Sequence, residues 1–371
     1  MDGVMTTAMM LILMVTLIPM VGILMAITPY LMKKSECFTV TVPETALRDP
    51  YLKGLKKRYL AEVLLATALL TAAGFLVSFL GNQLLTIVLL TVGTLFLVVF
   101  SYGLMLRNRS KVRIYKKEQN WHAVQQEAVA LTTGESAPRA LSLKWNLLYL
   151  PVIALTLLVG FLGYASIPEQ VPVHMGFDGQ VSTVEKSLSL ILMPALIQAF
   201  LALCFFFCHW MIIRSKRSSN PNAPATSALA YGMFAKAQTL YLLALGMILC
   251  VLMALMTFSF MGVVTLMQAG ISLMVGALAA IVGALAIAVV YGQGGSRVFA
   301  RMQESEAIPA DEDRFWKLGI FYVNREDPSL FLLERFGVGW TVNFARPAVW
   351  VILGLFVLLT VAFVVLMLLL S

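Results

Sequence analysis

The chain has 371 residues, of which 60% are hydrophobic and only 12% are charged. A soluble domain carries about 25% charged residues, so this composition excludes a soluble globular protein. The net charge of +8 could indicate nucleic-acid binding. In a membrane protein, however, basic residues mark the cytoplasmic loops, so we expect no nucleic-acid partner. We predict an all-α, polytopic transmembrane helical bundle in the lipid bilayer of the cell membrane.

Eight segments contain the run of about 20 predominantly apolar residues that a helix needs to cross a bilayer. The first is too long for a cleaved signal peptide, so we expect it to remain as a span. The start of the sixth is open, because residues 228–238 could instead form a separate segment at the membrane interface. The predicted spans are residues 4–31, 60–80, 83–105, 147–165, 188–213, 239–260, 264–291 and 347–370.

Lys and Arg are concentrated in the loops that follow spans one, three, five and seven. Of the 27 Lys and Arg, only Lys186 lies elsewhere. With eight spans, these four loops share one side, and the positive-inside rule places that side in the cytoplasm. We therefore predict that both termini lie outside the cytoplasm. The chain divides into a three-span region (1–146), a two-span module (147–213) and a C-terminal three-span region (214–371).

The first basic loop contains a helix start at Asp49-Pro50. An Asp side chain can accept hydrogen bonds from the free amides of a first helical turn, and Pro fits that turn. We expect a basic helix that begins here and runs into the second span. Residues 38–42 alternate in the manner of a short strand.

The loop between spans four and five, residues 167–187, is the longest polar loop predicted on the outer side. Asp178-Gly179 is a favoured two-residue hairpin turn. Pro168 and Pro172 keep the entry to the loop extended. We therefore predict a short β-hairpin-like loop on the outer surface.

His174 and Asp178 give this loop polar chemistry and could form a metal site or an acid–base pair. Catalytic zinc normally takes three protein ligands and a water molecule. Only one histidine is available in the loop, since His122 and His209 are predicted on the inner side. We therefore favour a structural loop, and we expect no metal ion, no cofactor and no catalytic residue.

The run Ile-Pro-Glu-Gln-Val-Pro-Val-His, followed by Asp178-Gly179 and then by Lys186, resembles the signature of the membrane family called domain of unknown function 1648. The two residues after the His, Met-Gly, stand where the family prefers an aromatic residue and Asn. The family includes the SdpI-type immunity proteins, which protect bacteria against their own peptide toxin and hold a repressor at the membrane. The resemblance implies a non-enzymatic immunity or signalling protein of the bacterial cell membrane. Its implied partners are an extracellular peptide and a cytoplasmic transcriptional regulator.

Span seven carries small residues at every fourth position, which would let a neighbouring helix approach closely: Gly276, Ala280, Ala284 and Ala288. The Gly-rich stretch that follows, residues 292–296, lacks the Lys-Ser/Thr ending of a phosphate-binding loop. We expect it to be a flexible exit from the span.

The last basic loop contains residues 315–346, which are rich in aromatic residues, Gly and Asn. This stretch resembles a tail module found in many relatives of the same family. Its aromatic residues suit a segment that lies on the membrane surface. The other interpretation is a docking surface for a cytoplasmic partner. The candidate docking residues are Trp316, Tyr322, Asp327, Pro328, Arg335, Trp340 and Asn343.

The spans contain almost no ionisable residues, which argues against a proton- or ion-coupled transporter. A small-molecule transporter or permease remains an alternative, in which Gln198, Gln268 and a few Ser and Thr would have to form the polar path. A membrane enzyme that uses His174 and Asp178 is a second alternative. We favour a protein without catalytic activity, because the sequence contains no complete catalytic set.

Overall fold

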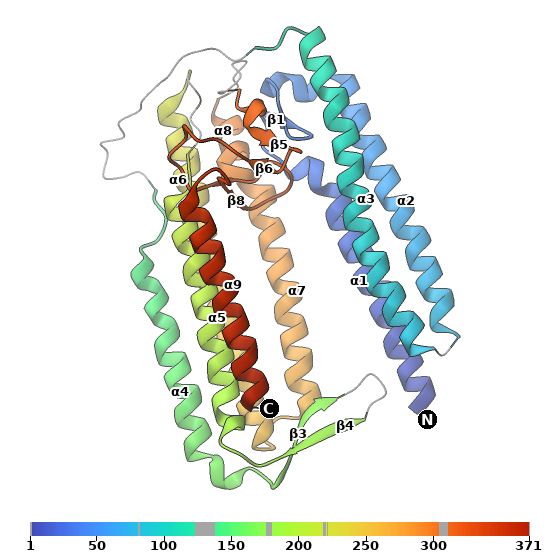
Figure 1. The fold of residues 1–371 in the computed structure, drawn as a ribbon, viewed down its shortest axis with the longest axis vertical. Helices are drawn as coiled ribbons and strands as arrows, with labels where there is room; N and C mark the ends of the chain where they lie inside the picture. Colours follow the sequence, from blue (N-terminus) through green and yellow to red (C-terminus); the bar gives the residue numbers. More distant parts are fainter. Residues whose placement is uncertain are drawn as a thin grey trace.

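The chain forms a helical bundle with small two-stranded sheets at its ends (Figure 1). The computed structural model describes residues 2–80, 82–122, 138–175, 180–217, 220, 222–303 and 311–370. Within these residues, eight helices are long and apolar enough to cross a membrane. The predicted all-α, polytopic architecture is therefore confirmed, with the predicted number of candidate spans.

The first three long helices pack against one another as one bundle (Figure 1). They are α1 (Asp2–Leu31), α2 (Pro50–Ser78) and α3 (Gln83–Glu118). The close approach of α1 and α2 depends on Gly22, where an added Cβ atom would lie 2.0 Å from the hydroxyl oxygen of Thr67. Helix α2 begins where the sequence predicts, because the Asp49 side chain accepts hydrogen bonds from the N–H groups of Tyr51 and Leu52.

The remaining long helices form a second bundle. They are α4 (Tyr149–Leu162), preceded by the 3₁₀ turn η2 (Leu143–Leu148), α5 (Ser189–Arg214), α6 (Pro224–Phe260), α7 (Leu266–Val290) and α9 (Pro347–Leu370). The predicted close approach is confirmed at Gly276 of α7, where an added Cβ atom would lie 2.4 Å from Leu252 of α6, whereas Ala284 of the same predicted stripe is exposed. Nearby, the Tyr241 hydroxyl donates to the carbonyl of Ala280 at 2.5 Å.

Helix α6 is longer than the predicted sixth span. It runs from Pro224 to Phe260 without a break, so residues 228–238 are its first turns and not a separate interfacial segment. These turns stay helical because they pack, with Tyr231, Phe234 and Ala235 buried among apolar neighbours. Helices α5 and α6 lie along each other, although the predicted boundary at residue 213 separates them. The division into three regions stays a prediction.

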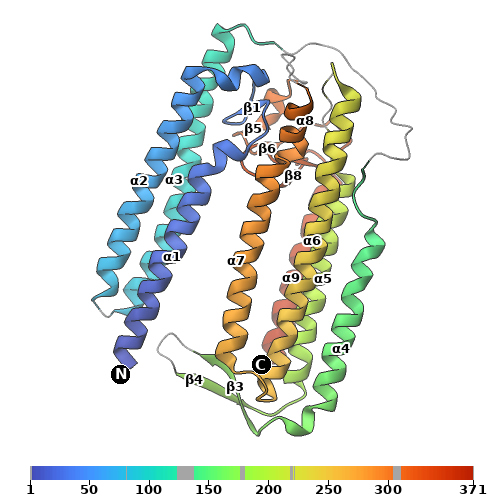
Figure 2. The same cartoon turned by 180° about the vertical axis from the view of Figure 1, so that it is seen from behind.

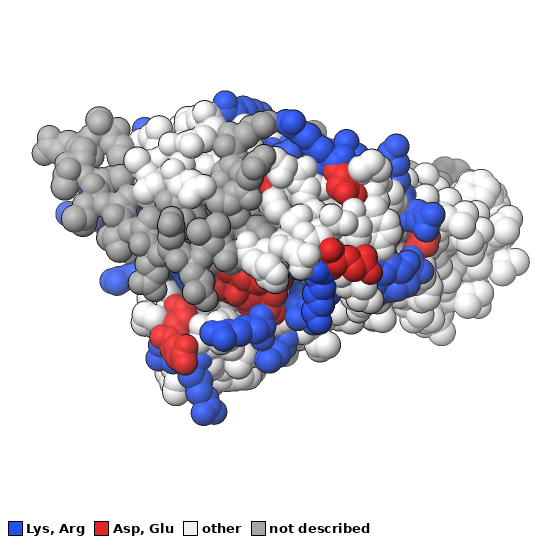
Figure 3. Space-filling view, turned by 90° about the horizontal axis from the view of Figure 1, so that it is seen from above, with Lys and Arg blue, Asp and Glu red and all other residues white. Residues whose placement is uncertain are grey.

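The two ends of the molecule differ in what they carry (Figures 1 and 2). One end holds α8 (Ser296–Met302) and three short sheets, formed by β1 (Glu36–Cys37) with β2 (Val40–Thr41), β5 (Trp316–Lys317) with β6 (Phe321–Tyr322), and β7 (Phe331–Leu333) with β8 (Trp340–Val342). We call it the basic end, because Lys and Arg are spread over it in Figure 3. The other end, the hairpin end, holds β3 (Gln170–Met175) and β4 (Val181–Glu185).

A large cluster of buried apolar side chains lies at the basic end, around β1 and β2. It includes Phe38, Leu52, Tyr59, Met105 and Val112, which come from the first loop, α2 and α3. By contrast, Val349 is the only buried residue among the described residues of α9, as expected of a helix that faces lipid. A large part of the buried core therefore lies where the first loop meets α2 and α3.

Candidate functional site

The hairpin predicted for the loop between the fourth and fifth spans is present. Strands β3 and β4 are antiparallel, with Val171 opposite Val184 and His174 opposite Ser182. The register shifts between Pro172 and His174, which marks a β-bulge. A Pro has no N–H group to donate to a ladder, and a bulge is one of the few places where a strand tolerates it.

One face of the hairpin is packed against the ends of the helices. Val171 is fully buried and, with Ile167, contacts Leu190 and Ile191 of α5 and Phe260 of α6. Strand β3 also lies against α7. The hairpin is therefore seated on three helices of the second bundle.

The two ends of the hairpin motif, Pro168 and Lys186, differ in their surroundings. Pro168 is exposed just before β3. The Lys186 ammonium lies 4.8 Å from the centre of the Tyr164 ring, a cation–π contact that closes the base of the hairpin. The loop thus fixes its only basic side chain near the helices.

His174 is exposed on the hairpin. Asp178 and Gly179 lie outside the described residues, so their predicted turn and the pairing of His174 with Asp178 stay predictions. In the described ranges, no three His, Cys, Asp or Glu side chains lie close enough together to hold a metal ion.

At the basic end, Asp313 joins three parts of the chain. Its carboxylate accepts hydrogen bonds from the Thr41 N–H at 3.1 Å, the Thr41 hydroxyl at 2.8 Å and Lys116 Nζ at 2.9 Å. It also accepts one from the Arg335 guanidinium. Burial alone would raise the pKa of Asp313, but Arg335 and Lys116 hold it at about 2. The group is therefore ionised at neutral pH and pairs with two cations.

A strained turn lies beside this carboxylate. Phe38 and Thr39 join β1 to β2 with φ values of 44° and 64°, in the left-handed region that favours glycine. Both side chains are fully buried. The Thr39 carbonyl accepts hydrogen bonds from Arg109 Nη1 at 2.5 Å and from Arg335 Nη1 at 3.1 Å. Such strain costs of order 1–3 kcal/mol per residue and persists only where the surroundings hold it.

Arg335 is the residue that these contacts share. Its guanidinium lies 4.9 Å from the Trp316 ring and 3.7 Å from the Glu36 carboxylate. These contacts add to those with Asp313 and Thr39. We call the group the basic-end junction: Thr39, Thr41, Arg109, Lys116, Asp313 and Arg335. It ties β1–β2 and α3 of the first bundle to the segment that precedes α9.

A second polar cluster connects this segment to the end of α5. Lys216 Nζ donates to Asp327 at 2.7 Å and also to Glu312. The Tyr322 hydroxyl donates to the same Asp327 carboxylate at 2.8 Å, and the Asn343 amide donates to the Asp327 carbonyl at 3.1 Å. Burial would raise the pKa of Asp327, but the hydrogen bond from Lys216 helps to hold it at about 2.

The Gly-rich exit from α7 is a packed turn, so the expectation of a flexible exit was wrong. Gln293 is fully buried. Its amide donates to the Gly339 carbonyl at 2.5 Å and accepts from the Gly339 N–H at 3.3 Å. Gly295 has φ of +80°, and an added Cβ atom would lie 2.3 Å from the Ala230 carbonyl oxygen. Reciprocal amide bonds of this kind fix the turn to the β7–β8 segment.

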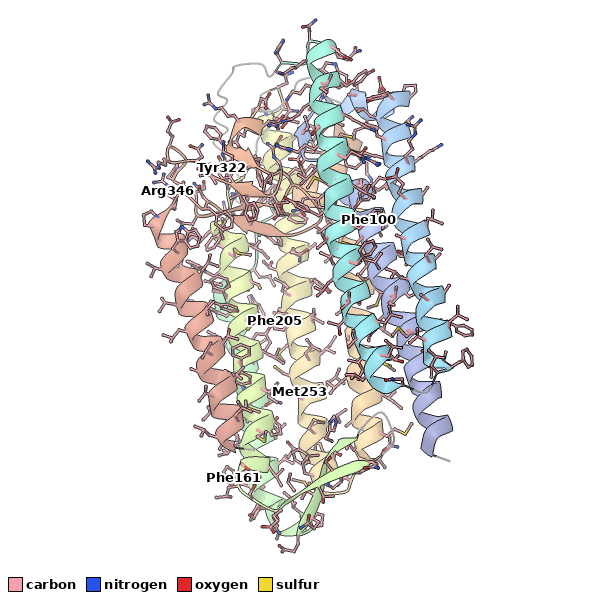
Figure 4. All side chains as sticks on the ribbon, turned by 45° about the vertical axis from the view of Figure 1, so that its right-hand side comes forward. Phe100, Phe161, Phe205, Met253, Tyr322 and Arg346 are labelled. Atoms are coloured by element: carbon pink, nitrogen blue, oxygen red, sulfur yellow. The ribbon has the colours of Figure 1, made fainter. Side chains whose placement is uncertain are left out.

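The candidate docking residues are mostly inside the fold. Five of them are buried: Trp316, Tyr322, Asp327, Arg335 and Asn343. Trp340 is half-buried against Phe234 of α6, with ring centres 5.9 Å apart, and Pro328 is exposed. Figure 4 places Tyr322 within this segment and Arg346 at its edge, where α9 begins. The buried members hold the two bundles together. Only the exposed side chains of this segment would be accessible to a partner.

Two family models match parts of the chain. Residues 152–197, which cover most of α4, the hairpin and the start of α5, match Domain of unknown function (DUF1648). Residues 325–350 match Family of unknown function (DUF5808), a segment that includes Asp327, Arg335 and Asn343. No curated protein and no solved structure matches the chain. The chain is a multi-pass membrane protein. Within that class, it carries the DUF1648 domain that the hairpin motif predicted.

Proposed function

We propose that the protein is a non-enzymatic immunity or signalling protein of the bacterial cell membrane, with a role similar to that of the SdpI type. The hairpin end would meet a membrane-active peptide outside the cell, and the basic end would report inside. The placement of Lys and Arg at the basic end supports this orientation.

The observation that carries the proposal is the packed path between the two ends. Phe260 of α6 contacts the hairpin, and Phe234 of the same helix stacks on Trp340 at the basic end. Helix α7 contacts β3 at one end and continues into the turn in which Gln293 binds Gly339. A ligand that shifts the hairpin would therefore move α6 and α7, which hold the segment that precedes α9 in place.

The test of the immunity role is protection of bacteria. Cells that express the chain are exposed to a panel of purified membrane-active bacterial peptides, and survival and membrane depolarisation are measured. Protection against at least one peptide is expected. Val171→Asp should abolish it, because it places a charge in the apolar seat of the hairpin. The control, His174→Gln at an exposed position of the same strand, should retain it. Lack of protection by wild type, or equal protection by Val171→Asp, would refute the proposal.

The reporting role requires a cytoplasmic partner, and a transcriptional regulator is the expected kind. Trp316 and Trp340 are packed, so their replacement would disturb the fold as well as any contact. Leu318 and Val323 are exposed on the same segment and offer a cleaner test. Co-purification from cells should recover the same specific partner with wild type, and the Leu318→Ser, Val323→Ser double variant should lose it at matched expression.

Transport of a small polar molecule is a second candidate, because one polar group lies deep between α4, α5 and α6. Gln198 is fully buried and donates to the Thr156 hydroxyl and the Cys250 carbonyl, both at 2.8 Å. Its amide oxygen has no hydrogen-bond partner in the described part of the chain. If the protein is a transporter, Gln198→Leu should abolish uptake of its substrate without affecting expression.

A further inference from the structure

A cavity of about 440 Å³ lies at the basic end, between the two bundles. This volume falls within the roughly 300–1,000 Å³ of typical ligand pockets. Three segments line it: the turn that follows α1, the 3₁₀ turn η1 (Glu44–Arg48) and α8. The lining residues are Lys34, Glu44, Thr45, Leu47, Arg48, Arg297, Ala300 and Arg301.

The charge of this cavity is strongly positive. Lys34, Arg48, Arg297 and Arg301 contribute four cations, and Glu44 contributes one acidic group. The cations come from both bundles and converge although like charges repel. Arg and Lys side chains are the usual partners of phosphate groups, and Arg can bind them through two parallel hydrogen bonds.

Arg297 is held in place at the centre of this arrangement. Its Nη1 donates to the Val289 carbonyl of α7, and its Nη2 donates to the Tyr30 carbonyl of α1, both at 2.9 Å. A guanidinium has five N–H groups, so these two bonds leave donors for a ligand. A fixed guanidinium binds an anion with a smaller entropic cost than a mobile one.

The position of the cavity along the helices also suits a lipid headgroup. Tyr30 and Val289 belong to the last turns of α1 and α7, so Arg297 marks the point where these two helices end. In Figures 1 and 2, α1 and α7 both run from this end towards the hairpin end. Both helices carry exposed apolar side chains, including Ile23 and Val282. Basic pockets between spanning helices on the cytoplasmic side are suited to anionic headgroups.

We propose that this cavity binds the phosphate group of an anionic phospholipid, whose acyl chains lie along the apolar surfaces of α1 and α7. The inference goes beyond the proposed function and holds whether or not the protein confers immunity. A bound lipid would bridge the turn after α1 and helix α8, and would so strengthen the contact between the bundles.

The test uses the full chain purified in a neutral detergent, and it measures the thermal unfolding midpoint at constant ionic strength. The additions are phosphatidylglycerol, phosphatidylcholine and inorganic phosphate. Phosphatidylglycerol should raise the midpoint, whereas the other two should not. The Lys34→Gln, Arg301→Gln double variant should need about tenfold more phosphatidylglycerol for the same rise, because two charge-assisted contacts are lost.

The matched control is the Lys57→Gln, Arg58→Gln double variant, which loses the same charge from an exposed face of α2. It should respond to phosphatidylglycerol as wild type does. An equal loss of response in both double variants would mean that the lipid binds by overall charge, and the cavity assignment would fall. An equal rise with inorganic phosphate would overturn the lipid as the source of the phosphate group.

Discussion

At the scale of a single residue, Asp313 shows how one carboxylate can hold together segments that are far apart in the sequence. It faces Lys116 and Arg335 with little exposure to solvent. Asp313→Asn would remove the carboxylate that these two cations share, although Lys116 keeps Asp311 at 2.8 Å and Arg335 keeps Glu36 at 3.7 Å. Removal of one partner from a buried ion pair typically lowers the free energy of unfolding by about 3–5 kcal/mol. Because each cation retains a second carboxylate, we expect a loss at the lower end of this range, measured by chemical or thermal unfolding in detergent.

The control for this variant is an exposed ion pair between α2 and α3. Glu62 and Arg107 are bonded at 2.5 Å, but both side chains are more than a third exposed. Glu62→Gln should therefore cost less than about 1 kcal/mol. If the two variants lose equally little, Asp313 does not hold the basic-end junction.

The same carboxylates predict how stability depends on pH. In the folded chain the pKa values of Asp313 and Asp327 are about 2, below the ordinary 3.8. A depressed pKa means that the unfolded chain binds the proton more tightly. The stabilisation is therefore complete above about pH 4 and is lost as the pH falls towards about 2. The unfolding midpoint of wild type should fall across this window. Asp313→Asn should show a smaller fall, and an identical fall would contradict the assignment.

At the scale of elements, the sequence predicts those features that depend only on residues close together in the chain. A span needs only length and apolar composition, and a helix start needs only a cap such as Asp49, so both were predictable. The hairpin followed from its own turn and Pro signals. The contact of β1–β2 with Asp313 joins residues 272 positions apart, and no local pattern encodes it. The acidic run 311–313, set among basic loops, was the one signal that could have indicated it.

The turn after α7 was wrongly expected to be flexible, because glycine-rich sequences occur both in flexible linkers and in tightly packed turns. Glycine-rich stretches are flexible in linkers, but glycine also permits positive φ and close backbone contact. Here the buried Gln293 indicates a packed turn. A buried amide needs hydrogen-bond partners, and Gln293 bonds both the carbonyl and the N–H group of Gly339.

That turn yields a prediction with an internal control. Gly262 and Gly295 both have positive φ, but a Cβ atom at Gly262 would meet open space, whereas one at Gly295 would clash with the Ala230 carbonyl. Gly262→Ala should cost about 1–2 kcal/mol from backbone strain alone. Gly295→Ala should cost a further 1–3 kcal/mol or so, because α6 and the turn must move apart. Thermal unfolding of the two variants measures the difference, and equal costs would show that the turn is loosely packed.

At the scale of the whole molecule, two helical bundles are joined at the basic end by charge and hydrogen bonds. The hairpin is seated on the second bundle alone, among the contacts described. A shift of the hairpin would therefore act on the second bundle first, and the junction would transmit it to the first.

The orientation of the molecule in the membrane decides what each end can meet. All but one of the 27 Lys and Arg lie in the four loops predicted on one side, which the positive-inside rule places in the cytoplasm. We expect a single cysteine at Gln180→Cys, on the hairpin, to react with an impermeant thiol reagent in intact cells. One at Lys57→Cys, at the start of α2, should react only after lysis. The background would lack the native cysteines, Cys37, Cys204, Cys208 and Cys250. The reverse pattern would place the hairpin in the cytoplasm, and a peptide could then not reach it from outside.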